Sequence, residues 1–285
     1  MKIGVLANLE KPGTAEALAR VAAAAQQHQF TLCGDAETLA VLGTGTLCLP
    51  QDIGTDCDLA LVLGGDGSML HAARLLAGSG VPQAGINTGT LGFMTCASVD
   101  RLEEVMQSLA EGDYQVDERR LLEAELHVSG SNPMTRHALN DVVVARGECA
   151  RVVSLELAVD GRAVTTYLCD GLIVATPTGS TAHSLSAGGP IVSPETPAVV
   201  ISVICPHTLT SRPLVLPDTS EIVLTVRRAA APLLVSVDGQ DTARFSLGDR
   251  VLVRRSPHVA RIVLLRDHDG FAVLRSKLGW RGSSV

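Results

Sequence analysis

The sequence predicts an α/β domain followed by an all-β domain, and three observations lead to this prediction. The chain has 285 residues, which is long enough for two hydrophobic cores. Up to Tyr114, apolar strand-like runs alternate with helix-like segments, as in a small open α/β sheet. After Tyr114, short β-type runs follow one another without a long amphipathic helix, which is typical of an antiparallel sandwich or barrel.

In the first domain, each element is assigned from its apolar pattern and from the residues at its ends. The run at 59–63 is apolar throughout, as in a strand that is buried on both faces of a parallel sheet. Asp100 and Glu103 have the spacing of a capping box, which predicts a helix that runs to about Ala110. We also expect strands at 3–8 and 83–86 and helices at 12–29 and 68–76.

In the second domain, the strands are assigned from runs rich in β-branched residues. Strands at 152–159 and 162–167 meet across Asp160 and Gly161, a favoured two-residue hairpin turn. Further strands are expected at 121–128, 138–145, 172–175, 199–205, 222–227, 233–237, 251–254, 261–265 and 271–274.

Composition and charge exclude several classes of protein. A net charge of −7, with only four Phe, two Tyr and one Trp, argues against nucleic-acid binding. No apolar run approaches the roughly 20 residues of a membrane span, and the N-terminus reads as a first strand rather than a signal peptide. We therefore expect a cytoplasmic protein without membrane partners. The seven cysteines contain no C-x-x-C pair, so buried reduced thiols are favoured over zinc ligands or disulfides.

The segment GGDGS at 64–68 follows the buried strand and is the first candidate site. It has Leu70 where a dinucleotide fingerprint needs glycine, and it lacks the lysine of a Walker A loop. A glycine turn before a helix still directs backbone N–H groups at an anion. Asp66 in that turn suits phosphoryl transfer, in which it would bind Mg²⁺ or accept a proton. The alternative is a structural turn in which Asp66 caps the helix.

The segment at 169–192 is the second candidate, because an apolar strand leads there into a loop rich in glycine and hydroxyl groups. Such a loop can bind a polyhydroxy or phosphate ligand through neutral hydrogen bonds, and its alternative is an ordinary polar loop. Asp170 precedes the strand and is either a ligand contact or a surface turn residue. The hydroxyl groups belong to Thr176, Thr178, Ser180, Thr181, Ser184 and Ser186.

Asn140 and Asp141 form the third candidate, because two polar residues interrupt an apolar strand there. Their side chains could form hydrogen bonds with both hydroxyls of a ribose, or the two residues could mark a bulge in an edge strand. The segment SVDGQ at 236–240 reads by itself as a plain hairpin turn, and His207 and Arg212 read as structural residues. Neither a Ser/His/Asp triad nor a metal-spaced His cluster stands out, and no residue is assigned as a metal ligand.

Together these segments resemble the NAD kinase family over almost the whole chain. GGDG is shared with lipid kinases of the same superfamily, whereas the N-x-G-x-L-G-F loop and TPTGSTA are specific to NAD kinases. The matching segments, in the order of the family, are GGDGS at 64–68, NTGTLGF at 87–93, ND at 140–141, DG with TPTGSTAHSLSAGGP at 170–190, PHTLTSRPLVL at 206–216, SVDGQ at 236–240 and KLGW at 277–280.

The resemblance implies an enzyme that phosphorylates the adenosine ribose 2′-hydroxyl of NAD to give NADP. The phosphoryl donor is ATP, and Mg²⁺ or another divalent cation is required. The implied fold is a Rossmann-like α/β domain at 1–116 and 266–285, whose last part is a tail that returns to it, with a β-sandwich at 117–265. Homodimers or homotetramers are implied as well.

The resemblance also assigns residues. Asp66 takes the place of the family's proposed general base, and Asp238 lies next to the reacting centre. Asp170 matches the aspartate that faces the nicotinamide end, and the segment 181–186 packs on NAD, in part across a subunit interface. The contact positions for substrate and cofactor are Asp66, Gly67, His71, Phe93, Asn140, Asp141, Arg151, Leu168, Asp170, Thr181, Ala182, His183, Ser184, Leu185, Ser186 and Gln240.

Three positions depart from the family pattern. Asp141 stands where most members have glutamate, and His183 replaces the usual tyrosine. Leu168 stands at a position linked to the choice between NAD and NADH. Two other functions were weighed: a diacylglycerol- or sphingosine-type lipid kinase, which usually has a basic face, and a non-catalytic NAD(P) sensor, which would not need Asp66.

Overall fold

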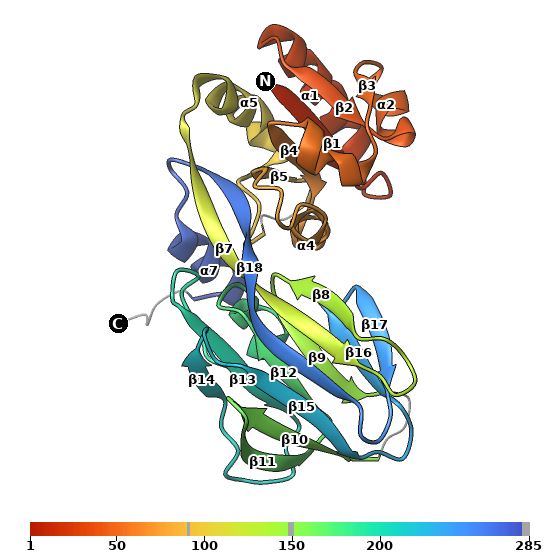
Figure 1. Cartoon of the computed structure of the whole chain (residues 1–285). Helices are drawn as coiled ribbons and strands as arrows, with labels where there is room; N and C mark the ends of the chain where they lie inside the picture. Colours follow the sequence, from red (N-terminus) through yellow and green to blue (C-terminus); the bar gives the residue numbers. More distant parts are fainter. Residues whose placement is uncertain (90–91, 148–150, 281–285) are drawn as a thin grey trace, which may run out of the picture. The chain divides into compact units, whose positions relative to one another are not determined.

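The computed structural model describes residues 1–89, 92–147 and 151–280, and the chain divides into two compact units (Figure 1). Unit 1 comprises Met1–Glu118 and Ala260–Val285, and unit 2 comprises Arg119–Val259. Strands β7 (Tyr114–His127) and β18 (Arg250–Leu265) each contribute residues to both units. Within the described ranges, no helix is long and apolar enough to cross a membrane.

Unit 1 is built on a parallel sheet with the strand order β5-β4-β1-β2-β3 and with β6 beside β5. The central strand β4 is buried at every residue, as the apolar run at 59–63 predicts. The strands are β1 (Lys2–Ala7), β2 (Thr31–Gly34), β3 (Thr46–Leu47), β4 (Leu59–Gly64), β5 (Gln83–Asn87) and β6 (Ala97–Ser98).

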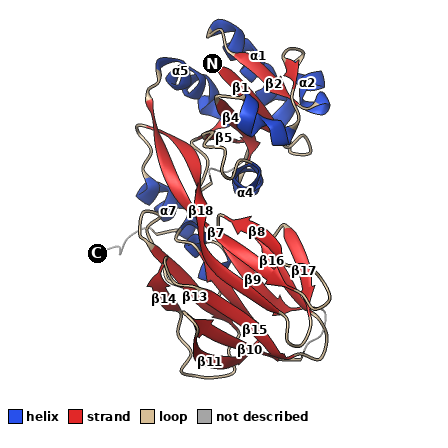
Figure 2. Cartoon of the chain, viewed as in Figure 1, coloured by secondary structure: helices blue, strands red, loops and turns tan. Residues whose placement is uncertain are grey.

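Helices cover this sheet (Figure 2). The alanine-rich helix α1 buries a face that includes Leu18 and Val21, and it packs against α5. The helices of unit 1 are α1 (Thr14–Gln27), α2 (Ala36–Leu42), α3 (Ile53–Asp56), α4 (Asp66–Leu75), α5 (Leu102–Glu111) and α7 (Gly270–Leu278), with short 3-10 turns η1 (Pro50–Asp52) and η2 (Val99–Arg101).

The sheet of unit 1 has a separate apolar core on each face. Successive residues of a strand point to opposite faces, so Leu59 and Leu61 of β4 pack with α1 and α5, whereas Ala60 packs on the other side. On β2, Leu32 belongs to the first core and Cys33 to the second. A sheet that is covered on both faces is the α/β arrangement that the sequence predicts.

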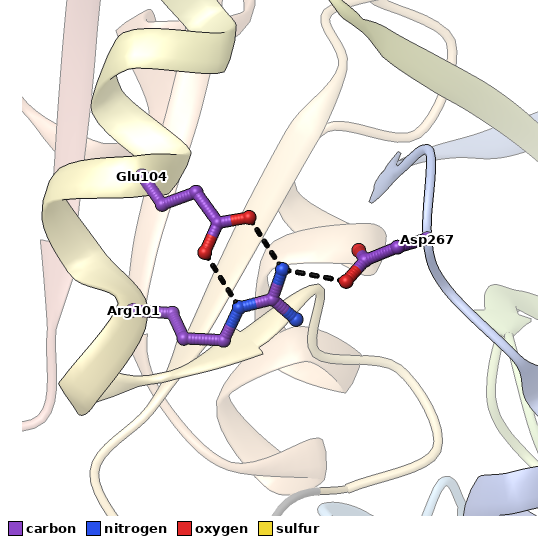
Figure 3. A network of polar contacts seen from close by, with 3 residues as sticks. All are labelled: Arg101, Glu104 and Asp267. Carbon is purple, nitrogen blue, oxygen red and sulfur yellow. Dashed lines mark hydrogen bonds and ion pairs between the residues drawn. The ribbon is translucent and has the colours of Figure 1, made fainter.

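The C-terminal segment belongs to unit 1, as the predicted tail does. Ile262 of β18 pairs in parallel with Gln83 of β5. Arg101 then links α5 to the segment after β18, because its guanidinium donates to both carboxylate oxygens of Glu104, at 2.7 and 2.5 Å, and to Asp267 at 2.8 Å (Figure 3). These side chains are exposed, so we expect each ion pair to contribute less than about 1 kcal/mol.

Unit 2 consists of two antiparallel sheets around one core, which confirms the predicted sandwich. One sheet has the order β14-β13-β12-β9-β16-β17, and the other joins β8, β7, β18, β15, β10 and β11. Phe245 and residues of both sheets form the core. The additional elements are β8 (Met134–Ala138), β9 (Asp141–Arg146), β10 (Val153–Val159), β11 (Arg162–Cys169), β12 (Gly171–Ala175), η3 (Thr178–Thr181), α6 (His183–Ser186), β13 (Ala198–Ile204), β14 (Leu214–Pro217), β15 (Ile222–Arg228), β16 (Leu233–Val237) and β17 (Asp241–Phe245).

The strand predicted at 271–274 is wrong, because this segment lies in helix α7. Its four consecutive apolar residues fit a buried strand, but the signals at its two ends belong to a helix. Asp269 caps the N-terminus by accepting a hydrogen bond from the Phe271 N–H at 2.9 Å, and Gly279 ends the helix with a φ of 65°.

Three other local predictions are corrected. The strands at 251–254 and 261–265 are parts of the single strand β18, and the strand at 138–145 is divided between β8 and β9. The capping box does not form, because Asp100 lies in η2 and Glu103 accepts two hydrogen bonds from Arg20 instead. The short elements β2, α2, β3, β8, β14 and β17 were not predicted.

Candidate active site

The glycine turn of unit 1 joins β4 to α4 and holds Asp66 by backbone hydrogen bonds. Gly65 is the N-cap of α4 and Asp66 its first residue, and no side chain caps this helix. The Asp66 carboxylate instead accepts hydrogen bonds from the N–H groups of Phe93 and Met94, each at 3.1 Å. The interpretation of Asp66 as a helix cap is therefore wrong, and each oxygen retains a lone pair for a ligand.

The end of the N-x-G-x-L-G-F loop and the next residue, Met94, supply these two N–H groups, because Gly92 lets the backbone approach the carboxylate. A methyl group at Gly92 would overlap the carboxylate of Asp66. The Gly92 N–H donates to Thr95 Oγ1 at 3.2 Å, which fixes the same stretch of chain. Two residues of the loop, Thr90 and Leu91, lie outside the described residues. The GGDG and N-x-G-x-L-G-F segments are thus parts of one local structure.

Lys11 lies at this turn and was missed by the sequence analysis. A methyl group built at Gly65 would be 3.0 Å from Lys11 Nζ and 3.9 Å from the side-chain amide of Asn87. A lysine was sought only at its Walker A position, but Lys11 follows β1, which is the parallel neighbour of β4. Because the carboxyl ends of parallel strands share one edge, the predicted topology was the signal that could have found it.

Thr88 is a second residue that the sequence analysis did not assign. Its Oγ1 atom is buried and has no hydrogen-bond partner within the described part of the chain. The Thr88 N–H donates to the carbonyl of Gly64 at 3.3 Å, so this residue lies directly beside the glycine turn. Gly67 and His71, both predicted contacts, are exposed on the first turns of α4. An ammonium group, a hydroxyl group and a carboxylate therefore gather around this turn.

In unit 2, Asp238 organises the segment that contains Asn140 and Asp141. Its carboxylate accepts hydrogen bonds from the N–H groups of Leu139 at 2.9 Å, Asn140 at 2.7 Å and Asp141 at 3.1 Å. Asp238 itself is buried and adopts a φ of 52°, a left-handed conformation that Asp tolerates better than most residues. The SVDGQ segment is therefore more than a plain hairpin turn.

Asp141 is a buried carboxyl group beside this second aspartate. Burial, with a smaller contribution from the negative charge of Asp238, raises the pKa of Asp141 to about 7. The alternative of an edge-strand bulge is wrong, because β9 pairs with β12 on one side and with β16 on the other. Asn140 precedes this strand and is half-buried. An interior strand thus begins with a carboxyl group that titrates near neutral pH.

The hydroxyl groups of the 169–192 segment mainly build the loop itself. Thr176 Oγ1 donates to the Leu139 carbonyl at 2.6 Å, and Ser180 Oγ donates to the Pro177 carbonyl at 2.6 Å. A methyl group at Gly179 would overlap the backbone of Asn140. Two further pairs are Thr181 Oγ1 with the Thr178 carbonyl at 3.2 Å, and Ser184 Oγ with Ser202 Oγ at 2.8 Å. The density of hydroxyl groups therefore reflects a tightly hydrogen-bonded turn.

Fewer side chains of this loop are exposed than the sequence suggested. In the predicted contact segment, His183 and Ser186 are exposed, whereas Ser184 is buried. The residues Thr181, Ala182 and Leu185 are intermediate. His183 and Ser186 are therefore the side chains of this segment that are most accessible to a ligand.

Asp170 is not an isolated turn residue. Its carboxylate pairs with the guanidinium of Arg146 at 3.0 Å, a partner that the sequence analysis did not assign. Leu168, two residues earlier, is 45% exposed on β11. Arg151 and Gln240 are exposed as well. Arg212 donates to the nearby carbonyl groups of Leu209 and Ser211, so its structural assignment agrees with the structure.

The predicted residues thus form two groups, one in each unit. In unit 1, Asp66 is brought together with Phe93, and Lys11 and Thr88 lie beside them. In unit 2, Asn140 and Asp141 are brought together by Asp238. An α/β unit with an aspartate in a phosphate-type glycine turn, together with a two-sheet β unit, defines a protein of the nucleotide-dependent phosphotransferase class.

Comparison with known proteins identifies the family within this class. Residues 3–114 match the ATP-NAD kinase N-terminal domain, and residues 139–265 match the ATP-NAD kinase C-terminal domain. The chain belongs to the ATP-NAD kinase family. The resemblance inferred from the sequence is thereby confirmed.

Individual relatives cover nearly the whole chain. The NAD kinase of Geobacter sulfurreducens is 39% identical over 279 residues, covering 98% of each chain. The NAD kinase of Heliobacterium modesticaldum is 41% identical over 276 residues, covering 97% of this chain and 98% of the relative.

Two solved structures share the fold. The crystal structure of yeast NADH kinase complexed with NADH covers 100% of this chain and 89% of its own, with a TM-score of 0.91 and 28% identity. The structure of an NAD kinase from Archaeoglobus fulgidus in complex with ATP covers 99% of this chain and 100% of its own, with a TM-score of 0.77 and 24% identity. These likenesses confirm the predicted fold class.

Proposed function

We propose that Asp66 is the general base in the transfer of a phosphoryl group from ATP to NAD. As a member of the ATP-NAD kinase family, the chain is an enzyme that phosphorylates NAD with ATP as the donor. The observation that supports the role of Asp66 is its carboxylate, which two backbone N–H groups hold in place at the end of a buried strand. A carboxylate so fixed presents its remaining lone pairs in a defined direction.

The reaction requires one proton acceptor. The 2′-oxygen of the adenosine ribose attacks the γ-phosphorus of ATP, and the bond from this phosphorus to the β,γ-bridging oxygen breaks. NADP and ADP are the products, and the hydroxyl proton passes to Asp66. A ribose hydroxyl is a poor nucleophile at neutral pH, so a positioned base contributes about 10²- to 10⁴-fold to the rate. The Lys11 ammonium and the Thr88 hydroxyl are proposed to bind phosphate oxygens beside the glycine turn.

The donor atoms at the turn also fit a divalent cation such as Mg²⁺. Mg²⁺ binds to hard oxygen ligands, commonly one or two carboxylates together with phosphates of the substrate, and Asp66 offers such a carboxylate. When bound, Mg²⁺ neutralises negative charge on the phosphates of ATP. Within the turn, Asp66 would hold the ion and Lys11 would supply a second positive charge.

Most of the residues proposed to bind NAD belong to unit 2. Asn140 and Asp141 are proposed to hold the ribose or the adenine, because Asp238 fixes the backbone of both residues. Asp170, held by Arg146, is proposed to face the nicotinamide end. The remaining proposed contacts are Gly67, His71, Phe93, Arg151, Leu168, Gln240 and the segment 181–186.

The two other functions have less support. Family models for NAD kinases match both units of the chain, which favours NAD over a lipid as the acceptor. A sensor would bind phosphate without transferring it, and it would gain nothing from a negative charge in the glycine turn. The presence of Asp66 therefore favours the enzyme.

An assay of NADP formation tests the role of Asp66. Purified protein is incubated with Mg-ATP and NAD, and NADP is followed with an NADP-specific dehydrogenase. We expect Asp66→Asn to lower kcat by about 10²-fold or more with a smaller effect on KM. Asp113→Asn, which removes an exposed aspartate paired with Arg266, is the matched control and should retain full activity. A fully active Asp66→Asn enzyme would refute the assignment.

A titration with Mg²⁺ separates the two chemical roles of Asp66. If Asp66 is only the base, Asp66→Asn lowers kcat at every Mg²⁺ concentration and leaves the half-saturating concentration unchanged. If Asp66 also binds the ion, the half-saturating concentration rises in the variant as well. Parallel reactions with NADH in place of NAD address the preference linked to Leu168.

Homodimers or homotetramers and a cytoplasmic location complete the proposal. Light scattering coupled to gel filtration would give the mass of the assembly relative to the 29.7 kDa chain. Subcellular fractionation with an antibody would locate the protein. A monomer would contradict the proposed assembly without affecting the assignment of Asp66.

A further inference from the structure

Three cysteines that are distant in the sequence converge on one face of the sheet of unit 1. Cys33 lies on β2, Cys48 follows β3, and Cys57 follows α3 immediately before the strand β4. Their spacing gives no C-x-x-C signal, so the sequence analysis treated them as separate buried thiols. All three belong to the core on the face opposite α1 and α5.

The three sulfur atoms are close enough to share a ligand. All three Sγ atoms lie within 4.8 Å of one another, and those of Cys33 and Cys57 are 3.1 Å apart. Sulfurs that bind one ion with bonds of about 2.3 Å are separated by about 3.8 Å in tetrahedral geometry. The distance between Cys33 and Cys57 is shorter than this value, and no pair in the cluster is farther apart than 4.8 Å. Small side-chain movements would therefore complete a three-sulfur site.

The surroundings of the cluster are apolar and offer the thiols little else to bind. Cys33, Cys48 and Cys57 are 0%, 6% and 8% exposed, and they pack against Ile53 and Leu76. The polar contact of Cys48 outside the cluster is a weak one, from Sγ to the carbonyl of Leu49 at 3.6 Å. The three sulfur atoms are therefore the main ligand atoms that this environment offers.

The burial of the three thiols argues against a reactive role, and their close approach favours a ligand-binding one. Burial raises the pKa of the Cys48 and Cys57 thiols, with further contributions from Cys33. Neutral buried thiols are poor nucleophiles, which argues against a redox or catalytic cysteine. A bound cation reverses this by stabilising the thiolates. Lys2 adds a positive charge that favours the thiolates of Cys48 and Cys57, and Asp56 opposes it at Cys48.

We propose that Cys33, Cys48 and Cys57 form a binding site for one soft divalent metal ion, of the class that contains Zn²⁺ and Cd²⁺. Binding forms three metal–sulfur bonds and releases three thiol protons to solvent. Three thiolates and a divalent ion carry one net negative charge. Thiolates select soft metals over Mg²⁺, so the site is distinct in chemistry from the glycine turn.

We expect a metal ion at the three cysteines to stabilise the fold and not to take part in the reaction. It would cross-link β2, the segment after β3 and the end of α3, at the start of β4, whereas Asp66 follows the other end of that strand. An ion that binds only the folded state stabilises it by RT ln(1 + c/Kd), where c is the concentration of the free ion. Metal binding is therefore expected to raise Tm without changing kcat.

A titration with Cd²⁺ tests the proposal, because cadmium thiolates have a charge-transfer absorption in the ultraviolet. The metal-free full-length protein is kept reduced with a phosphine and titrated at neutral pH. We expect one Cd²⁺ per chain, competition by Zn²⁺, and weaker binding at lower pH. Each of Cys33→Ser, Cys48→Ser and Cys57→Ser should weaken binding about 100-fold or more, since loss of a supporting residue alone costs 10- to 100-fold.

Matched controls come from the other cysteines. Cys169→Ser alters a buried thiol outside the cluster, and Cys205→Ser alters an exposed one, so both variants should bind Cd²⁺ like the unaltered protein. If a serine variant fails to fold, the alanine variant of the same residue replaces it. Independently, Cd²⁺ should protect these three thiols of the unaltered protein from alkylation, as read by peptide mass. Absence of a one-to-one complex, or equal binding by cluster variants and controls, overturns the proposal.

Discussion

Asp66 and Asp238 are both aspartates that follow a strand, but Asp66 begins a helix whereas Asp238 lies in the turn between β16 and β17. Each precedes a glycine, and each accepts hydrogen bonds from backbone N–H groups of a distant segment. Asp66 is half-buried and accepts two such bonds, whereas Asp238 is buried and accepts three. The comparison suggests a general distinction between the two aspartates. A buried carboxylate whose oxygens bind several backbone N–H groups, such as Asp238, stabilises the fold. A carboxylate with fewer such bonds, such as Asp66, has lone pairs available for a substrate or an ion.

The largest expected effect follows from exchanging the two aspartates for asparagine in parallel. Asp66→Asn should lower kcat about 10²-fold or more and leave the free energy of unfolding nearly unchanged. NADP formation and urea unfolding on the same samples check both expectations. If Asp66→Asn destabilised the protein as much as it slowed the reaction, the distinction between the two aspartates would fail.

The next effect concerns Asp141, the buried neighbour of Asp238, which makes the stability of the protein depend on pH. The pKa of Asp141 is raised from 3.8 to about 7, so the folded state binds a proton that the unfolded state releases between these values. Stability from this group is therefore greatest below about pH 4 and decreases as pH rises towards 7, by at most about 4 kcal/mol.

The pH effect can be measured as a difference between two proteins. Urea unfolding at pH 5 and pH 8 should show a loss for the unaltered protein that is largely absent in Asp141→Asn. Asp113→Asn, an exposed carboxylate, should follow the unaltered protein. Parallel pH profiles for the unaltered protein and Asp141→Asn would contradict the burial of a titrating Asp141.

Asp238→Asn should act mainly on stability. The substitution replaces one acceptor oxygen with an NH₂ group that faces a backbone donor, which costs about 2 kcal/mol. The measurement belongs at pH 5, where Asp141 is largely protonated and the charge of Asp238 matters least. An unfolding curve unchanged from that of the unaltered protein would remove the scaffold role of Asp238.

Gly92→Ala should give the smallest of these effects and would sharpen the account of Asp66. The added methyl group overlaps the carboxylate, so either Asp66 or the loop must move. We expect kcat to fall about 10-fold, because a displaced base is a weaker catalyst. Gly130→Ala tests a glycine with open space around it and serves as the control, although its φ of 79° adds strain. Steady-state kinetics on both variants would show whether the close approach matters.

The sequence predicted the parts of the molecule that depend on neighbouring residues. The buried run before GGDG predicted β4 correctly. Asp160 and Gly161 predicted the hairpin between β10 and β11, and both residues adopt a positive φ in its turn. The prediction failed for two different reasons. Glu103 pairs with the distant Arg20 instead of capping its helix. The apolar residues from Phe271 were assigned to a strand, although the adjacent Asp269 caps a helix there.

Much of the candidate site depends on chain topology, which a local pattern does not contain. Lys11 reaches the glycine turn because β1 and β4 are parallel neighbours, and Asp238 binds a segment that precedes it by 97 residues or more. The three cysteines meet only because β2, β3 and β4 bring separate loops together. Single residues such as Asp66 could be proposed from the sequence, whereas contacts such as those of Asp238 with the 139–141 backbone could not.

The long strand β18 has a consequence for how the protein is made. Unit 1 begins at the N-terminus, but Ile262 pairs with Gln83, and residues after β18 bond to α5. During synthesis, the ribosome must therefore produce all of unit 2 before the last segment of unit 1 emerges. Until then, the edge of β5 that pairs with β18 lacks this partner. An exposed strand edge can pair wrongly, so we expect chaperones to assist folding at this stage. Completion of unit 1 therefore follows the synthesis of unit 2 instead of preceding it.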